Sequence, residues 1–67
     1  MSKKTTATAI IKALKAKYKD DPEAMEEIER REKDIAYIEK KEAAGNYSGQ
    51  PSIGMAKMLE ADLEYWN

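Results

Sequence analysis

The side chains that could do chemistry in this chain are almost all carboxylates and amines. The sequence has 13 Asp and Glu residues, 12 Lys and Arg residues, and neither His nor Cys. Imidazole and thiolate groups are common general bases, nucleophiles and zinc ligands, so their absence removes these chemistries. Two carboxylates could still act as an acid–base pair, and Asp62 is the one acid flanked by large apolar residues. A single perturbed carboxylate is more typical of an interface ion pair than of a catalyst.

No spacing in the sequence matches a catalytic, cofactor-binding or metal-binding motif. The three glycines do not form a phosphate-binding fingerprint, and the acids do not follow a calcium-binding loop. A chain of 67 residues also leaves little room for a concave pocket. We therefore expect no catalytic residues, no metal and no cofactor, and we predict that the protein is not an enzyme.

Aromatic and flexible apolar side chains are the second group that could carry function. The chain has one Trp, four Tyr and four Met. Trp and Tyr are enriched among interface hot spots, and Met adapts to irregular partner surfaces. Several of these residues lie in the last quarter of the chain. We predict a protein interface formed by Met55, Met58, Leu59, Asp62, Tyr65 and Trp66, with Tyr37 and Tyr47 as further contact residues.

Three helices are predicted to position these side chains. Asp21 and Pro22 are typical of the N-cap and the first helical position, and Gly45 suits the left-handed residue after a helix. The sequence predicts an all-α fold with one small domain over residues 1–67: a helical hairpin plus a third helix. The predicted helices, of which the central one is the longest, cover about residues 5–19, 22–44 and 51–66.

The third helix is predicted to carry more apolar surface than the central helix can cover. The central helix has a narrow apolar stripe around Ile28 and Ile35, against which the other two helices should pack. The third helix is apolar over nearly half of its circumference, and an uncovered patch of this kind marks an interface. A core this small commonly needs a further source of stability, so we expect a homodimer or a larger assembly through the third helix. The alternative is that Leu59 and Trp66 fill the core of the protomer while Met58 and Tyr65 stay half exposed.

Charge is distributed unevenly along the chain, although the net charge is only −1. Residues 1–19 carry six lysines and no acid, whereas residues 20–42 carry ten acids and five bases. The basic first helix could neutralise the acidic central helix, or its lysines could meet an anionic partner. The alternative function is therefore nucleic-acid binding, which would be salt-sensitive and blind to sequence. It would use a lysine stripe, doubled by dimerisation, that consists of Lys4, Lys12, Lys15 and Lys19.

The function that these patterns favour is non-catalytic protein binding. We expect a small interaction module, such as an inhibitor or accessory factor, whose partners are a second copy of the chain and another protein. In size and composition it is comparable to accessory proteins of phages and mobile elements, an analogy that names no family. A third hypothesis, attachment of the first helix to an anionic membrane surface, is not adopted. Because targeting and bilayer-spanning patterns are absent from the sequence, as is cysteine, we expect a cytoplasmic location.

Overall fold

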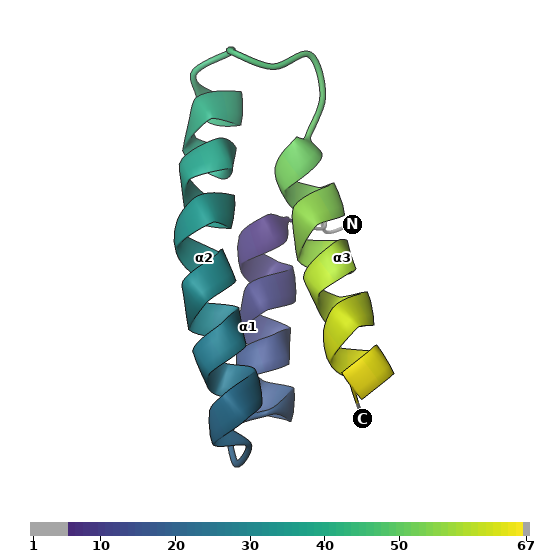
Figure 1. Ribbon diagram of the computed structural model, residues 1–67. Helices are drawn as coiled ribbons and strands as arrows, with labels where there is room; N and C mark the ends of the chain where they lie inside the picture. The colour runs from purple at the N-terminus through teal and green to yellow at the C-terminus, as the bar shows by residue number, and fades with distance from the viewer. Residues whose placement is uncertain (1–5, 67) are drawn as a thin grey trace, which may run out of the picture.

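The computed structural model describes residues 6–66, except for the side chain of Trp66, and contains three helices in this range. They are α1 (Ala7–Lys17), α2 (Pro22–Ala43) and α3 (Pro51–Trp66). No strand occurs within residues 6–66, so the all-α prediction is confirmed. Each helix packs against the other two, and the loop after α2 reverses the chain direction (Figure 1). The observed helix boundaries lie within two residues of the predicted ones.

Local sequence signals account for where the helices begin and end. The Thr6 hydroxyl accepts a hydrogen bond of 3.1 Å from the Ala9 amide and caps α1. The Asp21 carboxylate accepts one of 3.2 Å from the Ala24 amide and caps α2. Such caps satisfy amides of the first turn that lack a partner within the helix. After α2, Gly45 has a φ of +85°, in the left-handed region that favours glycine, as predicted.

The core lies where the three helices meet. Within α2 it uses the narrow stripe that the sequence predicts, with Ile28 completely buried. Because α1 packs against α3 as well as α2, two helices cover the inner side of α3. The buried apolar residues of the described chain are Ala7, Ile11, Leu14, Tyr18, Ala24, Ile28, Ile35, Ala56, Leu59 and Leu63.

A carboxylate of α2 holds the beginning of α3. The backbone amide and the hydroxyl of Ser52 donate hydrogen bonds of 2.6 and 2.8 Å to the two carboxylate oxygens of Glu42. Ser52 is almost completely buried, and α3 has no acid of its own in its first turn. Negative charge at a helix N-terminus is favourable because it opposes the positive end of the helix dipole. This contact joins the beginning of α3 to the end of α2.

Candidate interaction surface

The inner and outer sides of α3 differ sharply in exposure. Side chains turn by about 100° per residue, so residues spaced by three and four lie on one side of a helix. The inner side is buried and consists of Ser52, Ala56, Leu59 and Leu63. The outer face of α3, roughly opposite, is exposed and consists of Gly54, Met58, Ala61 and Tyr65. On it, Met58 is 68% exposed and Tyr65 is 90% exposed, so two large apolar side chains are presented to solvent.

A groove of about 280 Å³ between α2 and α3 borders this face. Buried Ile35 and Leu59 form its apolar floor, and Met58 belongs both to the groove and to the outer face of α3. The outer face and the groove therefore form one continuous surface. The groove is lined from α2 by Arg31, Asp34 and Ile35, and from α3 by Met55, Met58, Leu59 and Asp62.

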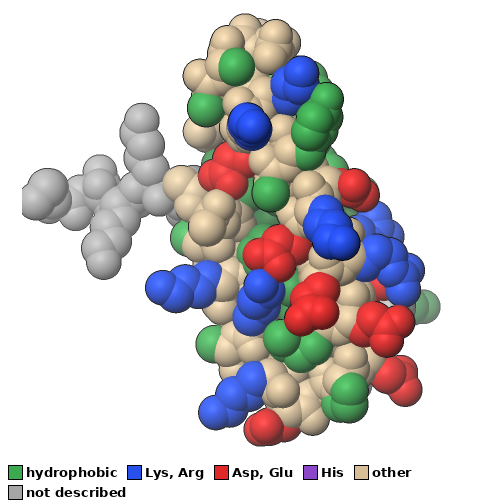
Figure 2. All heavy atoms as spheres, turned by 90° about the vertical axis from the view of Figure 1, so that its left-hand side faces the viewer, with side chains coloured by type: hydrophobic (Ala, Val, Ile, Leu, Met, Phe, Trp, Pro, Cys, Tyr) green, Lys and Arg blue, Asp and Glu red, His purple; other side chains and the backbone are tan. Residues whose placement is uncertain are grey.

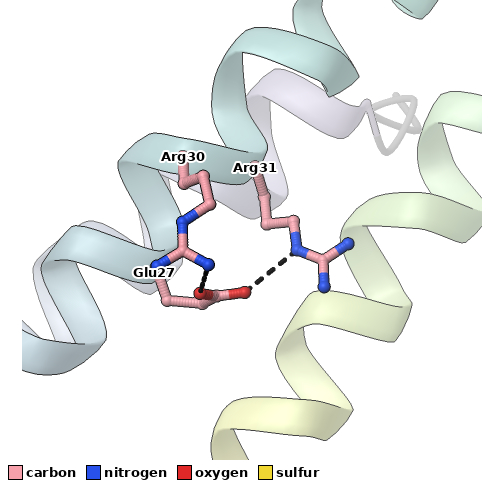
Figure 3. Close-up of polar contacts among 3 residues, drawn as sticks. All are labelled: Glu27, Arg30 and Arg31. Atoms are coloured by element: carbon pink, nitrogen blue, oxygen red, sulfur yellow. Dashed lines mark hydrogen bonds and ion pairs between the residues drawn. The ribbon is translucent and has the colours of Figure 1, made fainter.

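Glu27 pairs with two arginines of α2, of which Arg31 lines the groove. Its nearly buried carboxylate lies 3.0 Å from Nε of Arg31 and 3.1 Å from Nη1 of Arg30. Figure 3 shows the Arg31 side chain reaching from α2 toward α3. The hydrogen bond and charge of Glu27, followed by the charges of Asp62 and Asp34, raise the pKa of Arg31. Arg31 is therefore a fixed positive charge at the groove at any ordinary pH, because an arginine already titrates far above neutrality.

The residues predicted for the interface on α3 divide between the surface and the core. Met58 and Tyr65 are exposed, whereas Met55 is half-buried and lines the groove with exposed Asp62. Leu59 is only 3% exposed because it lies on the inner side of α3, so the structure places it in the core and not among surface anchors. The side chain of Trp66 lies outside the described residues.

Tyr37 and Tyr47 are exposed but do not line the groove. Tyr37 lies on α2 with 58% of its surface exposed, and Nζ of Lys41 lies 5.3 Å from the centre of its ring. Through this cation–π contact, the Tyr37 ring already has a partner within the protomer. Tyr47 lies in the loop after α2 and is 43% exposed. The structure does not bring these two tyrosines together with the outer face of α3 into one site.

The lysines of α1 are partly used inside the molecule. Nζ of Lys15 lies 2.7 Å from Oε1 of Glu32 on α2, which agrees with the expectation that α1 neutralises acidic α2. Lys12 and Lys19 are exposed, and Lys4 lies outside the described residues. The side of the molecule dominated by α2 shows acidic and basic side chains interspersed with hydrophobic ones (Figure 2). Positive charge is thus offset by neighbouring acids over much of this surface.

No protein-family model, curated protein or solved structure matches this chain. The candidate surface is therefore defined by its own geometry. Within the described residues, no group of acidic side chains is arranged to hold a metal ion. None of the described helices combines the length and apolar character needed to cross a membrane.

Proposed function

We propose that this protein is a non-catalytic interaction module that binds protein surfaces through the outer face of α3 and the adjoining groove. The observation that carries this proposal is the exposure of Met58 and Tyr65 on one side of a helix whose other side forms the core. Fully burying a large apolar side chain is worth about 1.5–3 kcal/mol. A partner that covers both side chains would recover much of that free energy.

The groove beside this face supports the same function. Protein interfaces combine an apolar centre with a polar rim, and here the apolar floor is bordered by Arg31, Asp34 and Asp62. Charges of both signs at the rim can orient a partner, while the flexible side chains of Met55 and Met58 can adjust to its shape. An inhibitor or accessory factor acts by occupying a partner's surface and needs no catalytic group.

A second copy of the chain is one of the two partners that we propose, the other being a different protein. The buried core is small, and a chain of 67 residues has limited apolar surface to bury by folding alone. Burial of two outer faces against each other would add to the stability of both subunits. Self-association through α3 would therefore stabilise this fold by burying apolar surface that the protomer leaves exposed.

The proposal is tested by sedimentation equilibrium across the micromolar range. We expect the wild type to self-associate and Tyr65→Ser to raise the dissociation constant at least tenfold, or about 1.4 kcal/mol. Tyr37→Ser is the matched control, because Tyr37 is also a largely exposed tyrosine but lies on α2. A wild type that stays monomeric would overturn self-association. An effect of Tyr37→Ser alone would move the contact surface to α2.

A further inference from the structure

The outer face of α3 alternates small and large side chains. Gly54, Met58, Ala61 and Tyr65 follow one another at spacings of four, three and four, and all are exposed. This is the spacing of the contact positions of a coiled coil over two heptads. Along the face the order is therefore small, large, small, large. A partner helix that matches this order would present large side chains where α3 presents small ones.

Gly54 is not required by the fold of the protomer. Glycine in a helix interior costs about 1 kcal/mol relative to alanine, and Gly54 lacks the positive φ that would favour glycine. A Cβ added there would meet no atom within 4 Å. The space next to Gly54 is thus open to a side chain from another molecule, and the absence of a Cβ permits close approach.

We propose that a second copy covers this face, with the two α3 helices antiparallel about a two-fold axis. This inference rests on the proposed function and specifies how the partner is arranged. In an antiparallel pair, the residue numbers of any two facing positions add up to the same total. Positions 54 and 65 give the same total as positions 58 and 61. Tyr65 then faces the partner's Gly54. Met58 faces the partner's Ala61, and the axis repeats both contacts.

The charged residues beside the face fit the same arrangement. Lys57 and Glu64 lie on its α1 side, where the Glu64 carboxylate is 3.9 Å from Nζ of Lys17. Antiparallel pairing brings Lys57 next to the partner's Glu64, and the two-fold axis produces a second such pair. Exposed pairs of opposite charge contribute little affinity but select the orientation of the partner.

A parallel arrangement fits the outer face of α3 less well. It would set Tyr65 against the partner's Tyr65 and Gly54 against the partner's Gly54, which crowds one layer and leaves the other empty. It would replace the Lys57–Glu64 pairs by pairs of Lys57 with the partner's Asp62, so charge alone does not separate the two arrangements. The match of side-chain sizes favours the antiparallel pair.

The contact is short, so the dimer should be weak. The four positions span about 16 Å at 1.5 Å per residue. Stable protein interfaces bury roughly 1,200–2,000 Å², which is more than one short helix pair provides. We expect a dissociation constant in the micromolar range.

Charge reversal tests this arrangement. Lys57→Glu and Glu64→Lys should each weaken self-association roughly tenfold, because each produces two contacts between like charges. Mixed in equal amounts, the two variants should form heterodimers about as stable as the wild-type dimer, since both contacts again join opposite charges. Sedimentation equilibrium at low ionic strength measures all three, and circular dichroism checks that each variant is folded. Lys33→Glu on α2 is the control, for which no change is expected.

Gly54→Leu tests the size match without changing charge. The open space beside Gly54 should let this variant fold, while its side chain blocks the partner's Tyr65 and reduces dimerisation at least tenfold. Unaltered dimerisation of Gly54→Leu, or mixed charge variants that show no preference for each other, would overturn the antiparallel arrangement. If Tyr65→Ser still dissociated the dimer, the proposed function would stand. A monomeric wild type would remove this arrangement and self-association, but not the binding of a different protein.

Discussion

The outer surfaces of α2 and α3 cover the same core but differ in what they present to solvent. On α2 the exposed side chains are mostly charged and include Glu26, Glu29, Arg30 and Lys33. On α3 the outer face presents Met58 and Tyr65, with Gly54 and Ala61 between them. A helix needs only one apolar side to pack in a small bundle. The outer side of α2 is suited to remain in water, whereas that of α3 is suited to contact another molecule.

The largest expected effect separates the inner and outer sides of α3. Leu63 is completely buried, and Leu63→Ala should lower the free energy of unfolding by about 2–5 kcal/mol. Met58→Ala on the outer face should change it by no more than about 0.5 kcal/mol at concentrations where the protein is monomeric. Urea denaturation measures both. Similar losses in the two variants would show that Met58 packs within the protomer.

The next effect concerns the contact that sets α3 against α2. Glu42→Ala removes the acceptor for the amide and hydroxyl of Ser52, and should lower the free energy of unfolding by about 1–2 kcal/mol. Glu29→Ala, at an exposed position of the same helix, should cost under about 0.5 kcal/mol. Thermal unfolding measures the stability of both variants. Equal stability of the two would show that the contact between Glu42 and Ser52 contributes nothing.

Gly45 in the loop after α2 and Gly54 inside α3 should respond in opposite directions. Gly45→Ala should lower the free energy of unfolding by about 1 kcal/mol, because Gly45 has a φ of +85°. Gly54→Ala should raise the free energy of unfolding of the monomer by about 0.5–1 kcal/mol, because Gly54 is helical with open space beside it. The measurement is urea denaturation at low protein concentration. Destabilisation by Gly54→Ala would mean that the protomer itself needs this glycine.

The smallest expected effect is on nucleic-acid binding. Lys15 is paired with Glu32, and acidic side chains offset basic ones across the α2 side of the molecule. We expect short duplex DNA to show no binding in fluorescence anisotropy even at low salt. Binding that fell steeply with salt, and was lost in the double variant Lys12→Ala/Lys19→Ala, would instead support the alternative function.

Much of the fold could be predicted because its signals are local. Asp21 and Gly45 lie within two residues of the ends of α2 and mark its limits. The spacing of Ile28 and Ile35 identifies its buried stripe. The sequence left the division of α3 between core and surface open, with Leu59 placed in the interface by one prediction and in the core by the alternative. Leu59 and Met58 belong to one broad apolar arc, and only the packing of α1 and α2 decides that Leu59 is covered while Met58 is not.

Contacts between residues on different helices could also not be predicted from the sequence. Glu42 and Ser52 lie on opposite sides of a loop, and no periodic pattern joins them. The role of Glu27 in holding Arg31 is suggested by their spacing of four, but the position of Arg31 beside the groove depends on where α3 lies. Such positions follow from tertiary packing, which a helical wheel does not contain.

Cysteine cross-linking probes the antiparallel pairing of α3 helices without interference, since the chain has no cysteine of its own. A mixture of Gly54→Cys and Tyr65→Cys chains, under mild oxidation, should form a disulfide-linked heterodimer. Each variant alone should not, because its two cysteines would be about 16 Å apart in an antiparallel pair, and a disulfide requires Cα atoms within about 7 Å. Cross-linking in Gly54→Cys alone, or none in the mixture, would rule out the antiparallel pair.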